Sequence, residues 1–283
     1  MRRRTPIYLI CSPRPRVGGT LVARLLTEFI HGDGRPVAAF DVNYDDFALA
    51  DWLPLHTTIA KIADTRGQIA LFDELIDNDD TVKIVDIGAW SFERFFGLVH
   101  ELDFMREARR RALLPVALFV ADPHRRSAEA YADLQERLPE LVLVPVCNGA
   151  VIREQQAREC FPARQAGGIP VRITPLQPFL KTFIDRPGFS FDKFLRRTAN
   201  AETELHAWIK SCFLAFRDLE MRLLLEVMKS TLQFVADAPT TSVPLPSASF
   251  PLGERNAAER HSPGKLRKQG RPVSTRSVSR EGP

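Results

Sequence analysis

Short apolar runs alternate with stretches of helical periodicity over most of the chain. The runs have the length of strands and are apolar at successive positions; they are residues 7–11, 36–42, 82–87, 116–121, 141–147 and 169–173. A strand with this pattern is buried on both faces, and the helices between such strands form the crossovers that a parallel sheet needs. The pattern therefore predicts an α/β fold, in which a doubly wound parallel sheet is the middle of three layers over residues 1–185.

Residues 201–236 show a different pattern, with apolar side chains three or four positions apart. The repeating positions are Leu205, Ile209, Cys212, Phe216, Leu219 and Leu223. This spacing predicts a long amphipathic helix, with at most one break, within a C-terminal helical region of residues 186–237. The helix either packs on the sheet domain or uses part of its wide apolar face to meet a second subunit or another protein partner.

The composition is ordinary for a globular protein. Apolar residues make up 45% of the chain and charged residues 26%, and no apolar run approaches the ~18 residues that a membrane-spanning helix needs. The start Met-Arg-Arg-Arg is a poor secretory signal, because charges follow its short apolar run closely. The four cysteines form no CxxC pair, which is typical of reduced core thiols,. We therefore expect a cytoplasmic protein without a membrane span.

The positive charge of the chain is concentrated at its C-terminal end. The formal net charge is +4, and residues 238–283 hold eight Arg and Lys residues against three Glu residues. This segment is rich in Pro and Ser and has few large apolar residues, so we expect it to be disordered. It is either a solubilising tail or a segment that weakly contacts nucleic acid, anionic lipid or an acidic partner.

The loop after the first predicted strand has the residues of a phosphate-binding loop. Gly18 and Gly19 allow the backbone to turn sharply and approach a ligand, and the start of the following helix favours an anion. Thr20 places a hydroxyl where such loops bind Mg²⁺, while Arg14 and Arg16 add positive charge,. The alternative is an ordinary tight turn with solvated arginines.

This loop resembles a degenerate form of the deviant Walker A loop of ParA/MinD-type ATPases, which are P-loop NTPases of the SIMIBI class. The pattern of that family is Lys-Gly-Gly-x-Gly-Lys-Thr, and residues 14–20 align with it. Arg14 takes the place of the signature lysine that reaches the nucleotide of the other subunit, and Thr20 matches the threonine. Gly19 takes the place of the phosphate-binding lysine, so that cation is missing.

Other segments resemble this family in the same order along the chain. Asp41 matches the first carboxylate of switch I, and Asn43 takes the place of the water-orienting aspartate, with Asp45 and Asp46 near enough to substitute for it. Asp86 matches the Walker B aspartate near Mg²⁺. Two further residues match the family: Gly88 in the γ-phosphate loop and Asn148 at the strand end that contacts adenine.

The resemblance implies a site for ATP and Mg²⁺ at the carboxyl ends of the strands. The nucleotide would be held by Arg14, Arg16, Val17, Gly18, Gly19, Thr20, Leu21, Gly88 and Asn148. Thr20 and Asp86 would hold the metal, and Arg14, Asp41 and Asp86 would act in catalysis. The missing lysine removes a charge that stabilises the transferring phosphoryl group, so we expect weak hydrolysis or none. The resemblance also implies nucleotide-dependent association, with a second copy or with a partner.

Two other functions fit parts of the sequence. The same fold can serve as a pseudo-NTPase, a binding or regulatory module that takes no nucleotide. Residues 12–14 and 18–21 also resemble the 5′-phosphosulfate loop of sulfotransferases, with three extra residues inserted. That enzyme would use a phosphosulfate donor and a catalytic base such as His31 or His56.

Overall fold

A computed structural model describes residues 4–43, 48–162, 168–197 and 201–236, with side chains to residue 229 in the last helix. These residues belong to one compact unit. The tail predicted for residues 238–283, and Asp45 and Asp46, lie outside the described residues.

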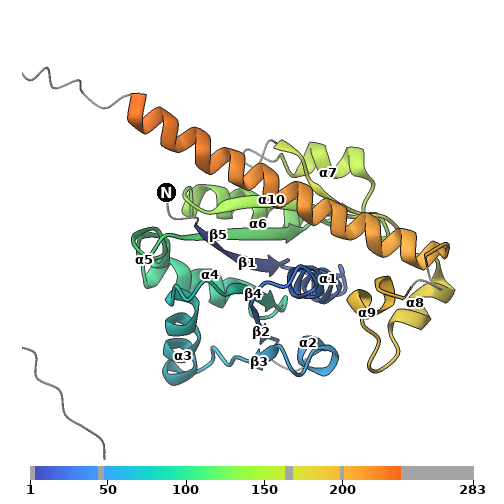
Figure 1. Ribbon diagram of the computed structural model, residues 1–283. Helices are drawn as coiled ribbons and strands as arrows, with labels where there is room; N and C mark the ends of the chain where they lie inside the picture. The colour runs from blue at the N-terminus through green and yellow to red at the C-terminus, as the bar shows by residue number, and fades with distance from the viewer. Residues whose placement is uncertain (1–3, 44–47, 163–167, 198–200, 237–283) are drawn as a thin grey trace, which may run out of the picture. The chain divides into compact units, whose positions relative to one another are not determined.

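Seven parallel strands form one sheet in the described chain (Figure 1). The strands are β1 (Thr5–Cys11), β2 (Val37–Val42), β3 (Thr57–Ile59), β4 (Val82–Ile87), β5 (Leu113–Val120), β6 (Val142–Asn148) and β7 (Val171–Ile173). Their order across the sheet is β3-β2-β4-β1-β5-β6-β7, so the order reverses beside the central strand β1. The predicted doubly wound parallel sheet is confirmed, and β3 is an added edge strand.

Helices cover both faces of the sheet. The helices are α1 (Gly19–Gly32), α2 (Ala48–Trp52), α3 (Thr65–Ile76), α4 (Phe92–Glu101), α5 (Phe104–Arg110), α6 (Arg125–Arg137), α7 (Glu154–Cys160), α8 (Pro178–Ile184), α9 (Phe191–Leu195) and α10 (Glu204–Ala236). One buried cluster joins the sheet to α3, α4, α5, α6 and α7, and a second joins it to α1, α2, α8, α9 and α10. Alternate β1 residues belong to different clusters: Leu9 lies in the first and Ile10 in the second. This two-sided burial explains why the strands are continuously apolar.

The predicted C-terminal helix is a single helix, α10, which packs on the sheet domain. Its apolar stripe from Leu205 to Leu223 is buried, and the Trp208 indole N–H donates to the Thr174 carbonyl at 2.8 Å. Glu220 accepts from Arg35 at 2.7 Å and from the Tyr8 hydroxyl at 3.3 Å. No helix in the described chain combines the length and the hydropathy of a membrane span.

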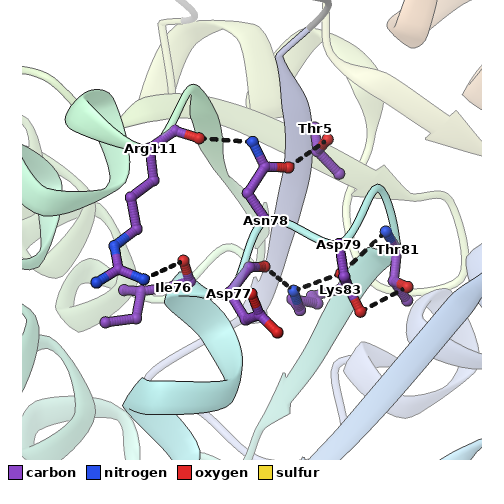
Figure 2. A network of polar contacts seen from close by, with 8 residues as sticks. All are labelled: Thr5, Ile76, Asp77, Asn78, Asp79, Thr81, Lys83 and Arg111. Carbon is purple, nitrogen blue, oxygen red and sulfur yellow. Dashed lines mark hydrogen bonds and ion pairs between the residues drawn. The ribbon is translucent and has the colours of Figure 1, made fainter.

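A polar network ties the loops together at the amino ends of the strands (Figure 2). Asn78, in the turn before β4, donates to the Arg111 carbonyl at 2.6 Å and accepts from Thr5 Oγ1 at 3.3 Å. The buried Lys83 ammonium donates to the Asp77 carbonyl and to Asp79 Oδ1. These bonds join the α3–β4 turn to β1 and to the α5–β5 turn. The candidate site lies at the other ends of the strands, which are their carboxyl ends.

Three of the four cysteines are buried, as expected of core thiols, but Cys160 is exposed. All four are free thiols. Cys160 is the last residue of the short helix α7, in which Ala157 is the buried residue.

Candidate functional site

The glycine-containing loop lies at the carboxyl end of the central strand. β1 ends at Cys11 and α1 begins at Gly19, so residues 12–18 connect them beside the point where the strand order reverses (Figure 1). Such a point is where open parallel sheets bind ligands. Arg16 and Gly18 have left-handed backbone conformations, with φ of 63° and 99°. A left-handed residue in a turn is a feature of the backbone concavities that bind anions.

The first turn of α1 has unpaired backbone N–H groups. Gly18 is the N-cap and supplies no side-chain hydrogen bond to them. The helix has no acidic residue in its first turn, so no carboxylate of its own offsets the positive end of the helix dipole. This end of α1 therefore favours an anion.

Thr20 and Asp86 meet beside the start of α1. The Thr20 hydroxyl donates to Asp86 Oδ2 at 2.7 Å. Asp86 lies near the end of β4, directly opposite Asp41 on β2. Asn43 connects these carboxylates, because its Nδ2 donates to Asp41 Oδ1 at 2.5 Å and lies 3.4 Å from Asp86 Oδ2. The structure thus brings the two predicted metal-binding residues together.

Asp41 is fully buried and supports α2. Its Oδ2 accepts from the backbone N–H groups of Leu49 and Ala50 at 3.0 and 3.1 Å. Burial raises the pKa of this carboxyl, although the hydrogen bonds from Asn43 and from the backbone oppose the rise. Asp41 therefore positions the first turn of α2, and the catalytic role implied by the resemblance remains a prediction.

Gly88 follows β4 and lies against Asn43. A Cβ atom at Gly88 would lie 2.2 Å from Asn43 Oδ1. Only glycine at this position leaves room for the Asn43 side chain, so Gly88 allows Asn43 to keep its contacts with Asp41 and Asp86.

Asn148 braces the loop from the end of β6. Its Nδ2 donates to the Val17 carbonyl at 2.9 Å, and its Oδ1 accepts from the Ala150 backbone at 3.1 Å. A Cβ atom at Gly18 would lie 2.5 Å from this Nδ2. The sequence predicts Asn148 at the site but does not reveal this contact, because the contact joins residues far apart in the chain.

Arg14, in the same loop, lies near Asp122 in the β5–α6 connection. Its Nε is 3.7 Å from Asp122 Oδ1, and 42% of its side chain is exposed. Asp122 is not among the site residues predicted from the sequence, although its position directly after an apolar strand is a signal that could have indicated it. The oxygens of Asp122 also accept from the His124 backbone and the Ser127 hydroxyl.

An open cavity of about 380 Å³ adjoins Arg14. Its lining comprises Arg14, Pro15, Arg16, Val17, Asp122, Pro123, His124 and Val151. The two arginines of the loop thus line this cavity, whereas Thr20, Asp86 and Asn43 do not. Leu21, in the first turn of α1, is partly buried and packs against the second cluster.

A Cβ atom at Gly19 would meet only ordinary contacts, at 3.7 Å from Asp86 Oδ1 and 3.9 Å from Ile10 Cγ2. The backbone at this position therefore accommodates a side chain. Among the described residues, no group of three or more His, Cys, Asp or Glu side chains is placed to hold a metal ion by itself.

A search of solved structures finds this arrangement of strands and helices. A chain of the MinC:MinD cell division protein complex from Aquifex aeolicus is 15% identical, with a TM-score of 0.50; the match covers 75% of this chain and 95% of that one. The chain has a MinD-like fold. The fold class expected from the ParA/MinD resemblance is thereby confirmed.

Two further matches are to the MinD cell division protein of the same organism and to a nucleotide-binding protein from Archaeoglobus fulgidus in complex with ADP. The MinD match is 15% identical, covers 75% of this chain and 96% of that one, and has a TM-score of 0.46. The other is 14% identical, covers 63% and 85%, and has a TM-score of 0.42. No protein-family model and no curated protein matches the sequence. At these identities, the MinD-like fold is what the comparisons establish.

Proposed function

We propose that this MinD-like protein binds ATP together with Mg²⁺ at the loop of residues 12–18 and hydrolyses it slowly or not at all. The observation that carries the proposal is the Thr20–Asp86 hydrogen bond of 2.7 Å beside the uncapped start of α1. A hydroxyl, a carboxylate and free backbone N–H groups are together the donor set that a magnesium–polyphosphate complex requires.

The side chains present fit Mg²⁺ better than they fit a metal whose ligands are all supplied by the protein. Mg²⁺ prefers oxygen ligands and is usually bound by one or two protein groups, with phosphates and water completing its shell. Thr20 Oγ1 and Asp86 would supply two oxygens, and Asn43 would orient the carboxylate through its amide. When bound, the ion neutralises charge on the phosphates.

The missing lysine argues for binding with little hydrolysis. Gly19 supplies no cation to the β- and γ-phosphates, and Arg14 lies 3.7 Å from Asp122, with which it lines the adjoining cavity. Binding depends on the whole loop, whereas the rate depends on charge placed at the transferring group. Loss of one such group typically lowers a rate by ~10²–10³.

Isothermal titration of the full chain with ATP·Mg²⁺ tests binding. Thr20→Val keeps the shape of the side chain but removes the hydroxyl, and we expect it to weaken ATP·Mg²⁺ binding about tenfold or more. Because the lost group acts through the metal, the same variant should bind ATP in EDTA as the wild type does. GTP in a parallel titration identifies the preferred base. No heat at millimolar ATP·Mg²⁺ would favour the pseudo-NTPase module instead.

Gly19→Lys tests whether the missing cation limits hydrolysis. The position has room for a side chain and an ordinary backbone conformation, so the lysine should reach bound phosphates. We expect phosphate release from ATP to rise by about 10²-fold. Gly19→Met, which has a side chain without charge, should leave the rate unchanged; an equal rise in both variants would contradict the electrostatic explanation.

We further propose that nucleotide changes the association of the protein with a second copy or a protein partner. Exposed apolar residues along α10 support this: Leu214, Met221, Leu224, Leu225 and Met228. Sedimentation with and without ATP·Mg²⁺ measures self-association directly. An identical sedimentation coefficient in both conditions would leave only association with a different protein.

The sulfotransferase alternative gains no support from the geometry. His31 lies in the last turn of α1, at the opposite end of the helix from the loop. The His56 ring lies beside the His31 ring, with 4.5 Å between their centroids. A 14-residue helix is about 20 Å long,, so neither imidazole is placed to take a proton from a substrate at the loop.

A further inference from the structure

A second site lies at the start of α4, where a buried serine hydroxyl has no partner. Ser91 is the N-cap of this 10-residue helix, but its side chain makes no capping bond. Only 2% of the residue is exposed, and its Oγ neither donates nor accepts a hydrogen bond among the described residues. An unsatisfied buried hydroxyl lowers the free energy of unfolding, and a ligand that accepted its hydrogen bond would offset that loss.

Ser91 lines a cavity of about 300 Å³, together with Ile62, Ala63, Trp90 and Arg94. The five residues supply distinct chemistry on different sides. Ser91 and Arg94 are donors that suit an anion, and the start of α4 adds the positive end of its dipole, which Glu93 in the first turn partly offsets,. Ile62, Ala63 and Trp90 are apolar, and 83% of the Trp90 residue is exposed.

The walls of this cavity are fixed by the fold. Gln68 Nε2 donates to the Ile62 carbonyl at 2.9 Å, which holds the segment before α3. Phe95 of α4 stacks on Phe72 of α3, with ring centroids 5.7 Å apart. The cavity therefore lies between the segment before α3 and the start of α4, two helices that this ring contact joins.

Two carboxylates of α4, Glu93 in its first turn and Glu101 at its last residue, do not line the cavity. Glu93 lies 4.0 Å from Arg137 of α6. Glu101 accepts from Arg94 at 3.4 Å, but half of the Arg94 side chain remains exposed. The guanidinium thus stays accessible, and the pair is a weak surface contact that a better anion can replace.

We propose that this cavity binds a small organic carboxylate with an apolar or aromatic body. The carboxylate would accept from Ser91 Oγ and Arg94, and the body would lie between Trp90 and the Ile62–Ala63 wall. A bare anion would leave the apolar side of the cavity empty, and a neutral molecule would leave the dipole and the guanidinium unmatched. The site is separate from the Thr20–Asp86 cluster, so its test needs no nucleotide.

Phenylacetate is the probe, and Trp90 is the reporter. We expect phenylacetate to change the tryptophan fluorescence of the full chain saturably, and Trp90→Phe to remove that change. Phenylacetamide, which is neutral, and inorganic phosphate, which has no apolar body, should each bind at least tenfold more weakly. Equal binding of the amide would overturn the anion assignment, equal binding of phosphate would overturn the apolar assignment, and no saturable change at tens of millimolar would overturn the site.

Variants of the two donors locate the carboxylate. Ser91→Ala and Arg94→Gln should each weaken phenylacetate about tenfold, whereas Arg106→Gln, at an exposed ion pair on α5, should have no effect. Thermal unfolding provides an independent readout. Ser91→Ala should unfold at the same or a higher temperature, because it removes an unsatisfied hydroxyl. A lower temperature would show that the hydroxyl is already satisfied within the protein and would overturn the proposal.

Discussion

Gly18 and Gly19 are adjacent in the sequence but occupy different environments. Gly18 has a left-handed backbone and lies against the Asn148 amide, whereas Gly19 begins α1 at a position where a Cβ atom would make only ordinary contacts. The sequence indicated that both glycines belong to a loop at the site, because they follow an apolar strand. It did not distinguish them, because the Asn148 amide lies against Gly18 through its hydrogen bond to Val17, which joins residues 131 positions apart.

Replacing each glycine by alanine should separate these roles. Gly18→Ala forces an unfavourable φ and a clash at 2.5 Å with Asn148 Nδ2, so we expect the free energy of unfolding to fall by about 2 kcal/mol. Gly19→Ala should change it by less than about 0.5 kcal/mol. Denaturant unfolding measures both. Similar losses for the two variants would mean that the loop does not hold Gly18 in this conformation.

At the scale of elements, the buried Arg24–Glu28 ion pair lies within α1, with 3.7 Å between Nε and Oε1, and both residues are hydrogen-bonded to the end of α8 or to the segment after it. Arg24 donates to the carbonyls of Ile184 and Phe189 at 3.0 and 2.7 Å, and its guanidinium lies 4.2 Å from the Trp52 ring centre. Glu28, one turn later, accepts from Ser190 Oγ at 2.5 Å. The apolar spacing of the sequence predicts a helix here. It does not indicate that Arg24 and Glu28 are buried, because their hydrogen-bond partners are distant in the chain.

Glu28 should make stability depend on pH. Burial raises the pKa of this carboxyl above its ordinary value of 4.5, against the lowering effects of Ser190, the backbone and Arg24. The folded protein therefore holds a proton that the unfolded chain releases first, and stability falls as pH rises through the folded pKa. In denaturant unfolding from pH 4 upward, wild type should lose stability relative to Glu28→Gln.

The exposed Glu74 on α3 provides the control for that measurement. Glu74→Gln should give a stability curve parallel to that of the wild type across the same pH range. If Glu28→Gln is also parallel, the Glu28 carboxyl has the same pKa in both states and the buried pair does not act as described.

The edge strand β3 shows where sequence patterns fail for elements. Its three residues, Thr57–Ile59, include two threonines, and the residue exposures increase toward its end. A strand paired on one side only, and so short, carries no apolar run, so its existence depends on the β2 backbone beside it. The five longer strands were predictable because burial on both faces leaves a continuous apolar signal. The other edge strand, β7, is as short as β3 but lies within the apolar run of residues 169–173.

For the whole molecule, α10 joins distant parts of the core. It packs against β7 and α1, and Phe216 lies 6.0 Å from the ring centre of Phe29. The sequence predicted the helix and left open whether it packs on the sheet domain or meets a partner. The packing is now established, while the exposed residues of the same helix keep the second possibility as a proposal.

Trp208 should be the main anchor of α10. It is buried, and its indole N–H is bonded to Thr174, so Trp208→Ala removes packing and leaves that carbonyl unpaired. We expect the free energy of unfolding to fall by about 3–5 kcal/mol. Met221→Ala, at an exposed position of the same helix, should cost less than about 1 kcal/mol. Comparable losses would indicate that α10 contributes through helix formation rather than through docking.

The position of α10 also affects how the protein is made. The ribosome synthesises this helix after every strand of the sheet, yet its side chains complete the apolar layer over α1. Until the helix emerges, the nascent chain presents that layer to water and is prone to aggregate. We therefore expect the chain to depend on a chaperone during translation and to become independent of it only once residues 204–223 have left the exit tunnel.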